Sequence, residues 1–218
     1  MIMAYRCGGR RGYSTLVLLA VLSLPCGACV QTAALWANIT GGDVIEAQYT
    51  LTTGPLLILI DDRDSVVTEP RAIRRMHKTI SDALLEYGKN RRVVPFEDCQ
   101  ALQRSAKKYD RLSVREIGEK LGADQVLYIR VDRFTLRAEP GAPLFKGEFV
   151  VRVKVLSTER KQDVRLWPRD ESGRRVAATT EPISTDGDKS AGDVARELAT
   201  NAGQAVAKLF YQHRALDK

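Results

Sequence analysis

Leu56-Leu57-Ile58-Leu59-Ile60 is an unbroken aliphatic run that stops at the acidic stretch Asp61-Asp62-Arg63-Asp64. Side chains alternate between the two faces of a strand, so a run without polar positions predicts a strand that is covered on both faces. Pro70 then suits the start of a helix. The apolar residues that follow at helical spacing are Ile73, Met76, Ile80, Leu84 and Tyr87, and Gly88 is expected to end the helix. We therefore expect a buried strand followed by an amphipathic helix.

Two long strands are predicted further along the chain. Gln125 to Leu136 reads as one strand, and its apolar phase changes near Asp132-Arg133, which predicts a β-bulge. Pro140-Gly141-Ala142-Pro143 predicts a turn that leads into a partner strand over Phe145 to Val155. That partner alternates, which predicts one solvated face; its charged residues, candidates for contact with a partner protein, are Lys146, Glu148, Arg152 and Lys154.

Shorter elements complete the pattern. Val93-Val94 is a short strand candidate, and Asp98 is expected to cap a helix that runs through Tyr109. Ser113 with Glu116 and Ser190 with Asp193 are capping boxes, and the second opens a helix whose apolar stripe extends to Leu209 and Phe210. Two further strands are expected at Val164-Trp167 and Arg175-Thr180. The expected fold class is α/β (α+β), with a mixed β-sheet, a long antiparallel meander and helices packed mainly on one face.

The first residues of the chain describe an export signal. Arg6, Arg10 and Arg11 precede the short apolar run Thr15 to Leu24, and the small residues Gly27-Ala28 follow it. A spanning helix needs about 20 apolar residues, roughly twice the length of this run. We therefore interpret residues 1–28 as a signal peptide.

Cys26-Gly27-Ala28-Cys29 resembles the lipobox of bacterial lipoproteins, in which a Gly-Ala pair precedes the cysteine that becomes the diacylated N-terminus. The resemblance implies lipidation, for instance with palmitate, at Cys29, with Cys26 as the alternative. The family favours Leu where this chain has Cys26. The residue after Cys29 is Val30 and not Asp. The resemblance implies that a lipoprotein without Asp at this position is compatible with sorting to the outer membrane. The domain division follows: signal peptide 1–28, lipidated N-terminus and tether 29–55, and one globular domain 56–215.

Charge and cysteine content exclude several classes. The net charge is +7, and loss of residues 1–28 removes three arginines and no acid, leaving +4. Short basic pairs without interleaved aromatics do not predict a nucleic-acid site. Cys99 is the only cysteine in the expected globular part, so no internal disulfide is expected there and the thiol is expected to be buried and inert. Two histidines, His77 and His213, both within helical patterns, make neither a zinc site nor a convincing base for Cys99, so no metal, cofactor or catalytic residue is expected.

One motif favours an enzyme. Asp62-Arg63-Asp64-Ser65-Val66, directly after a hydrophobic strand, resembles the first motif of haloacid-dehalogenase-type phosphotransferases. The resemblance implies Asp62 as nucleophile, Asp64 as general acid/base and Mg²⁺ between them. The second acidic motif of that family is missing, since Asp188 follows a polar segment and Asp193 is better explained as a helix cap.

A second resemblance concerns the fold. Ile117-Gly118-Glu119-Lys120-Leu121-Gly122-Ala123-Asp124 leads into Val126-Leu127-Tyr128-Ile129. This step is similar to one in the N-terminal domain of the Tol–Pal translocation protein, the curli-secretion lipoprotein and the lipoprotein activators of penicillin-binding proteins. The whole chain also resembles lipoproteins of planctomycete-type bacteria. The likeness covers about residues 56–213 and transfers no functional residue.

The sequence thus favours a non-enzymatic binding or scaffold module. We expect it to be lipid-anchored in the bacterial cell envelope, facing the periplasm with the outer membrane favoured. Its expected partners are the membrane, through the anchor, and an envelope protein of an assembly or secretion process. The Mg²⁺-dependent phosphohydrolase that uses Asp62 and Asp64 is the alternative, and a homo-oligomeric secretion component is a third possibility.

Overall fold

The fold is taken from a computed structural model that describes residues 43–88, 92–106, 108–137, 139, 143–159, 164–185 and 187–215. The expected signal peptide, Cys26, Cys29 and most of the turn at 140–143 lie outside these residues. Val44–His213 forms one compact unit. Among the described residues, no helix is both long and apolar enough to cross a membrane.

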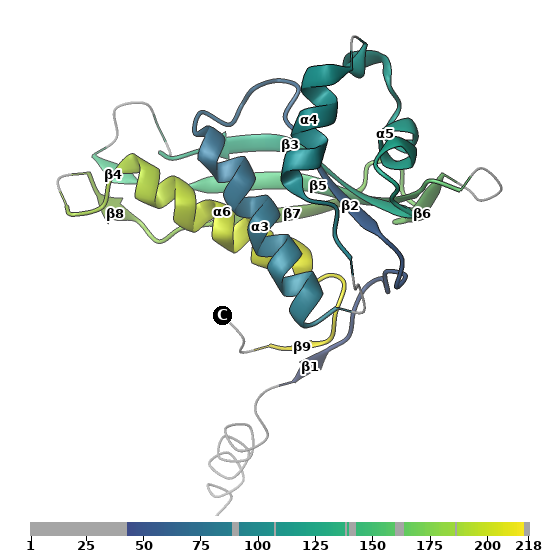
Figure 1. The fold of residues 1–218 in the computed structure, drawn as a ribbon. Coiled ribbons are helices and arrows are strands. Elements are labelled where there is room, and N and C mark those ends of the chain that lie inside the picture. Colours follow the sequence, from purple (N-terminus) through teal and green to yellow (C-terminus); the bar gives the residue numbers. More distant parts are fainter. Residues whose placement is uncertain are drawn as a thin grey trace, which may run out of the picture. The chain divides into compact units, whose positions relative to one another are not determined.

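A five-stranded mixed sheet is the centre of this unit (Figure 1). Strand β2 (Leu56–Asp61) pairs in parallel with β3 (Gln125–Thr135), and β3 pairs antiparallel with β5 (Glu148–Ser157). The register shifts between Val131 and Arg133, which confirms the expected bulge. Strands β6 (Arg165–Trp167) and β7 (Arg174–Thr179) both pair antiparallel with β5, at successive positions along it. They therefore form one interrupted edge of the sheet.

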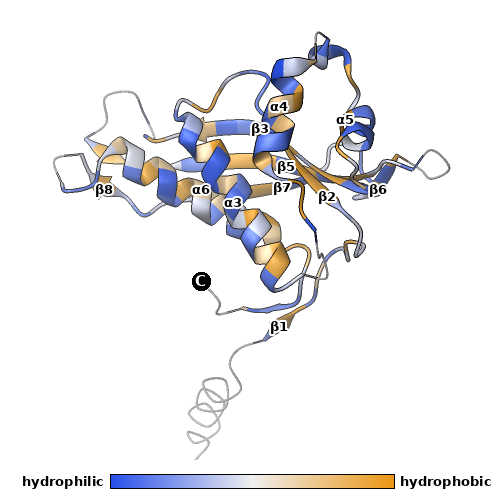
Figure 2. Ribbon diagram, viewed as in Figure 1, coloured by the Kyte–Doolittle hydropathy of each residue, from blue (hydrophilic) through white to orange (hydrophobic). Residues whose placement is uncertain are grey.

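Two long helices cover one face of this sheet. Helix α3 (Pro70–Glu86) and helix α6 (Ala191–Ala207) pack against each other and bury one side of β2, β3 and β5. Gly203 permits their close approach, because a Cβ there would lie 2.9 Å from Thr79 Cβ and 3.1 Å from the Met76 carbonyl oxygen. Figure 2 shows β2 and β5 mainly in hydrophobic colours and both helices with hydrophilic and hydrophobic turns in alternation.

The opposite face is covered at one end only. Helix α4 (Phe96–Ser105), the 3₁₀ turn η1 (Tyr109–Arg111) and helix α5 (Val114–Lys120) lie there. They enclose a second core that contains Leu57 and Leu59 of β2, Val126 of β3 and Leu156 of β5. β2 is thus buried from both sides, as its unbroken apolar run predicts. The predicted fold class, a mixed sheet with an antiparallel meander and most helix packing on one face, is confirmed.

Two small ladders complete the unit. β1 (Val44–Ile45) pairs with β9 (His213–Arg214), and β4 (Leu144–Phe145) pairs with β8 (Ile183–Ser184). The chain between β1 and β2 is part of the body: Leu51 is buried, and the Tyr49 amide donates to the Leu209 carbonyl at 3.3 Å. Among the described residues, the compact unit therefore starts before residue 56, within the segment expected to be a tether.

Three local expectations were wrong in detail. Asp98 is not an N-cap, because α4 begins at Phe96 after Pro95 and Asp98 lies in the first turn; the helix also ends at Ser105, so Tyr109 lies outside it in η1. The last helix ends at Ala207, so Leu209 and Phe210 are buried beyond it. His213 lies in β9 and not in a helix. Both capping boxes are present as expected, at Ser113 and at Ser190.

Candidate functional site

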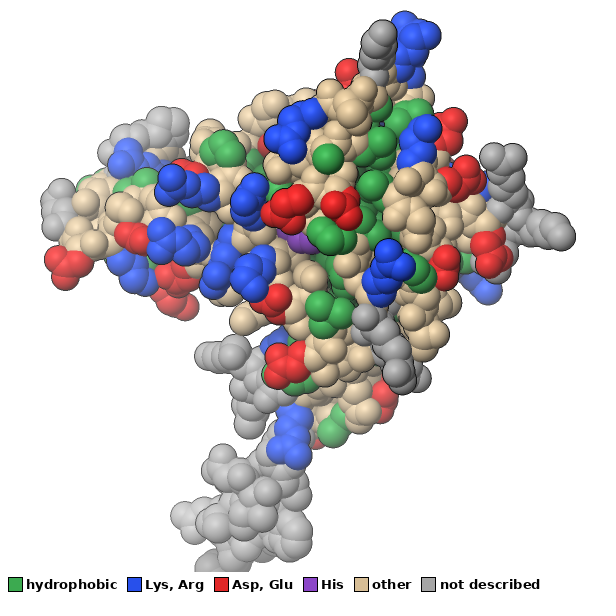
Figure 3. Space-filling view, in the orientation of Figure 1, with side chains coloured by type: hydrophobic (Ala, Val, Ile, Leu, Met, Phe, Trp, Pro, Cys, Tyr) green, Lys and Arg blue, Asp and Glu red, His purple; other side chains and the backbone are tan. Residues whose placement is uncertain are grey.

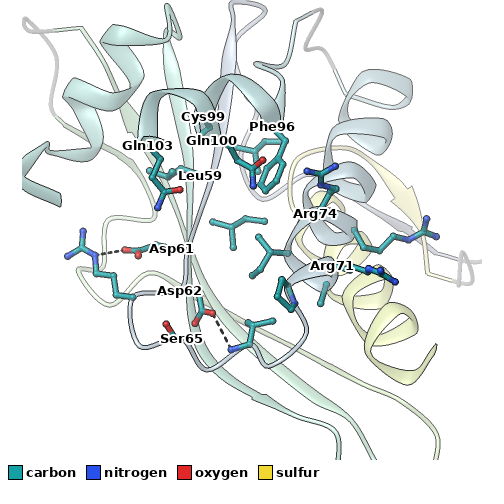
Figure 4. A pocket seen from close by; sticks show the side chains of 18 of the residues that line it. Leu59, Asp61, Asp62, Ser65, Arg71, Arg74, Phe96, Cys99, Gln100 and Gln103 are labelled. Atoms are coloured by element: carbon teal, nitrogen blue, oxygen red, sulfur yellow. Dashed lines mark hydrogen bonds and ion pairs between the residues drawn. The ribbon is translucent and has the colours of Figure 1, made fainter. Parts of the chain in front are cut away.

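A groove with a volume of about 1340 Å³ lies beside β2, between α3 and α4. Leu59, Asp61 and Asp62 of the β2 region lie between its two walls (Figure 4). The α4 wall presents Phe96, Cys99, Gln100 and Gln103, and the α3 wall includes Arg71 and Arg74. The groove thus opens at the carboxyl end of a buried strand, where ligands collect in α/β folds.

The edge of β2 along this groove has few backbone partners. Leu56 makes a parallel bridge with Val93: its amide donates to the Arg92 carbonyl at 3.0 Å, and its carbonyl accepts from the Val94 amide at 2.8 Å. Backbone groups of a strand alternate between its two edges, so the amides and carbonyls of Ile58 and Ile60 face this same side. Within the described part of the chain, no hydrogen bond satisfies them. Pro95 and the start of α4 end the segment that would otherwise have continued along β2.

Asp61 and Asp62, at the end of β2, form hydrogen bonds and an ion pair with other groups of this chain. Asp61 accepts a hydrogen bond from the Tyr128 hydroxyl at 2.5 Å and pairs with Arg63 at 3.0 Å. Burial, together with the hydrogen bond and charge of Asp61, raises the pKa of Tyr128 to about 12. This hydroxyl therefore remains a proton donor at neutral pH.

Asp62 organises the loop that follows. Its Oδ1 accepts from the Val66 amide at 2.9 Å and its Oδ2 from the Val67 amide at 3.1 Å. These bonds enclose Ser65, whose φ of 49° lies in the left-handed region. Asp64 is exposed and does not line the groove. The structure therefore gives Asp62 a loop-holding role and does not bring the two aspartates together over the groove.

His77 of α3 packs against the start of α4. It is buried, and its ring centroid is 5.0 Å from that of Phe96. Its Nε2 has no hydrogen-bond partner among the described residues. Burial lowers the pKa of His77 to about 4, and the charge of Glu97 opposes this only in part. The imidazole is thus neutral at physiological pH.

Cys99 is half-buried on the α4 wall. Its Sγ lies 3.9 Å from the Tyr109 hydroxyl, and burial raises the pKa of the thiol. Burial likewise raises the pKa of Tyr109. A raised pKa disfavours the reactive thiolate. In the described ranges, no three His, Cys, Asp or Glu side chains lie close enough together to hold a metal ion.

A row of basic side chains borders the groove along α3. Figure 3 shows blue side chains gathered over α3 and α6; those that line the groove are Arg71, Arg74, Arg75, Lys78 and Arg196. We call these five residues the basic rim. Their partners are exposed or carry no charge: Arg74 lies over the Phe96 ring and 3.9 Å from Glu97, and Lys78 pairs with Asp82 at 2.7 Å. Arg75 donates to the Thr200 hydroxyl at 2.9 Å, and Arg196 pairs with Asp193 at 3.2 Å. Such surface pairs contribute about 1 kcal/mol or less, so the rim retains its positive charge for a ligand.

The face of β5 expected to be solvated is only partly open. Val150 and Leu156, which share it, are buried. Glu148 accepts from Arg133 at 3.1 Å, and Arg152 donates to Asp132 at 2.6 Å. Burial alone would raise the pKa of Asp132, but hydrogen bonds and charges of Arg152 and Arg130 outweigh it and lower that pKa. These charged groups therefore neutralise each other within the sheet, while Lys146 is exposed and Lys154 half-exposed.

Sequence reasoning missed the groove. The positions Arg71, Arg74, Arg75 and Lys78 repeat at helical spacing on the side of α3 away from its apolar stripe, so the basic row was visible as a pattern. The free edge of β2 has no comparable local signal, because it depends on the path of the chain after Val94.

Comparison with known proteins gives likeness in fold alone. No protein-family model matches the sequence, and no curated protein is significantly similar to it. Solved structures that are similar include a PelC dodecamer from Paraburkholderia phytofirmans, with 14% identity over 78% of this chain and 99% of that chain and a TM-score of 0.39. Lipoprotein GNA1162 from Neisseria meningitidis has 14% identity over 70% of this chain and 97% of its own, with a TM-score of 0.41. Protein CT253 from Chlamydia trachomatis has 14% identity over 72% and 91%, with a TM-score of 0.40.

Proposed function

We propose that this protein is a lipid-anchored envelope protein and acts as a non-enzymatic binding or scaffold module that faces the periplasm, the outer membrane being favoured. The observation that carries the anchor is the order of features at the start of the chain. Three arginines, a short apolar run and Gly27-Ala28 lead directly to Cys29. Cys29 is the proposed site of lipidation.

The anchor has a simple physical basis. Each buried methylene contributes about 0.8 kcal/mol to membrane binding, and stable anchoring takes two acyl chains or one chain with a second signal. A diacylated cysteine meets this condition without any spanning helix. The folded unit of Val44–His213 would then be held at the membrane surface through residues 29–43.

We propose the groove between α3 and α4 as the partner-binding face. Its support is the combination of the apolar residues Ile58, Leu59 and Ile60 in its lining, the basic rim, and a strand edge whose backbone groups at Ile58 and Ile60 have no partner among the described residues. The carboxylates at its end support binding over catalysis. Asp61 is engaged by Tyr128 and Arg63, and both oxygen atoms of Asp62 are engaged by backbone amides.

Membrane fractionation tests the anchor. We expect the wild-type protein in the membrane fraction, without residues 1–28 and lipidated. The Cys29→Ala variant is expected to keep residues 1–28. Cys26→Ala is the matched control and is expected to be processed and lipidated. The opposite pattern would move the lipid to Cys26. Equal behaviour of all three proteins would contradict the anchor.

Crosslinking in intact cells tests the binding role. We expect a crosslinked envelope protein to be recovered with the wild-type chain. Mg²⁺-dependent hydrolysis of a generic phosphate ester that is lost in Asp62→Asn would contradict a non-enzymatic role and favour the phosphohydrolase.

A further inference from the structure

We infer that the groove binds an extended acidic peptide segment of a partner protein, which joins the free edge of β2 as an additional strand. This inference rests on the binding role proposed for the groove and is independent of the lipid anchor. Three observations carry it: the backbone edge, the two different walls and the sign of the charge on the rim.

The backbone edge selects an extended peptide. Ile58 and Ile60 present two amides and two carbonyls to the groove at the regular spacing of a strand. Unpaired backbone groups away from water are costly, so an edge of this kind favours an occupant with a matching row of donors and acceptors. An added strand supplies that row, as in other complexes formed by strand addition. The bridge between Leu56 and Val93 shows that a chain already pairs with this edge at the start of the groove.

The two walls set the side chains of the occupant. Residues of an added strand point alternately to either face of the sheet, and here one face is the α3 wall and the other the α4 wall. Arg71 and Arg74 lie on the α3 side. The guanidinium of Arg71 has no partner among the described residues. That of Arg74 lies over the Phe96 ring, 5.6 Å from its centroid, and makes a long contact of 3.9 Å with exposed Glu97. Carboxylates at alternate positions of the peptide would reach this wall.

The α4 wall favours peptide side chains of a different kind. Phe96 is half-buried against His77 and Arg74 and offers the remaining part of its ring as an apolar surface. Gln100 and Gln103 offer amide donors and acceptors (Figure 4). Apolar or amide side chains are therefore expected at the positions between the carboxylates. The predicted ligand alternates acidic residues with apolar or amide residues.

The charge of the rim disfavours a second copy of this chain as the occupant. Two copies paired through their β2 edges would bring two basic rims together, and like charges across an interface are repulsive. Basic side chains outnumber acidic ones in the groove lining, where the acidic ones are Asp61, Asp62, Glu69 and Asp110. An acidic peptide is therefore attracted to the basic rim, and its association is expected to weaken as salt rises.

A peptide array tests the inference with the full-length protein in mild detergent. The probes are peptides of about eight residues, longer than a typical strand, with alternating acidic and apolar or amide residues; the controls are the same compositions in scrambled order. We expect retention of alternating peptides over scrambled ones. An array from which no alternating peptide is retained would overturn the inference.

Backbone methylation distinguishes strand addition from simple charge attraction. In a retained peptide, N-methylation at the residues whose amides face β2 is expected to weaken binding by about tenfold per lost hydrogen bond. Methylation shifted by one residue, on amides that face away, leaves affinity unchanged. Hydrogen exchange at the Ile58 and Ile60 amides is expected to slow on binding. Equal effects of both methylation registers would overturn the inference.

Charge reversal on the protein tests whether the basic rim contributes to peptide binding. Arg71→Glu with Arg74→Glu is expected to weaken peptide binding by at least about tenfold. Arg174→Glu with Arg175→Glu on β7, both exposed and outside the groove, is the matched control and retains wild-type affinity. A dimer that dissociates in the groove variant would identify a second copy as the occupant and overturn the inference. Loss of the crosslinked partner from the groove variant in cells, without retention of any alternating peptide by the wild-type protein, would overturn only the peptide. A partner that the groove variant still captures would also overturn the groove as the partner-binding face.

Discussion

At the scale of single residues, His77 is a buried histidine whose environment favours its neutral form. Its pKa is lowered to about 4, against 6.5 for an exposed histidine, because burial disfavours the charge. The unfolded chain therefore binds more protons than the native chain between these two values. Stability from this group is complete above about pH 6.5 and is lost as pH falls toward 4.

This linkage predicts the pH dependence of unfolding. Between pH 7 and pH 5 the wild-type protein is expected to lose about 2 kcal/mol of unfolding free energy through His77. His77→Leu keeps an apolar side chain against Phe96 and removes the titration. Urea denaturation of both proteins at the two pH values measures the difference. An identical pH dependence in the two proteins would contradict the buried, neutral imidazole.

Asp62 is a second residue whose role the geometry defines. Asp62→Ala removes both acceptors for the Val66 and Val67 amides, and we expect it to lower the unfolding free energy by about 1–2 kcal/mol. Asp64→Ala, at an exposed neighbouring position, is expected to change it by less than about 0.5 kcal/mol. Equal destabilisation by the two variants in denaturant titrations would refute this role.

Residue patterns alone could not separate these roles. Asp62 and Asp64 look equivalent in the sequence, and the resemblance to a phosphotransferase motif treats them as a pair. Which of them bonds to backbone amides depends on the loop conformation around Ser65. By contrast, Ser113 and Asp193 could be predicted as capping residues, since a capping box is local and spans only four positions.

At the scale of elements, the packing of α3 on α6 depends on Gly203. A Cβ there would press on Thr79 and on the backbone of α3 at Met76. We expect Gly203→Ala to destabilise the protein by about 1–3 kcal/mol, because the cost of overpacking exceeds the gain in helix propensity.

Gly192 is the matched control on the same helix. Its nearest contact to an added Cβ is Ser190 Oγ at 3.7 Å. Gly192→Ala is therefore expected to be neutral or to stabilise by up to about 1 kcal/mol through propensity. Thermal denaturation of the two variants compares them directly. A stabilised Gly203→Ala protein would contradict the close helix contact.

Element positions were predictable where periodicity is local. The apolar run of β2, the stripe of α3 and the phase change at the β3 bulge are all read from short windows. The start of α4 and the end of α6 could not be predicted in this way. Asp98 and Phe210 fit helical spacing, but Asp98 lies within the first turn of α4 and Phe210 lies beyond the end of α6. Short sequence windows also do not show which strands pair with each other. The free edge of β2 results from that strand order, because β2 is the outermost strand of the sheet.

At the scale of the whole molecule, the chain combines a start that we interpret as an export and lipidation signal with a folded unit that carries a groove bordered by the basic rim. The order of elements was sufficient to predict a mixed sheet. It was not sufficient to predict that α4 and α5 cover the opposite face, because both helices are short and their apolar residues, such as Ile117, fit either side. That arrangement matters for the proposed binding role, since the groove exists only because α3 and α4 lie on opposite sides of β2.

The most direct test of the account is the mass of the mature N-terminal peptide from the membrane fraction of cells that express the full chain. We predict a polypeptide that begins at Cys29, lacks residues 1–28 and carries two acyl chains. Palmitate label is incorporated into the wild-type protein and is absent from Cys29→Ala. An intact chain with residues 1–28 attached and an unmodified thiol at position 29, recovered from the cytosol, would contradict it.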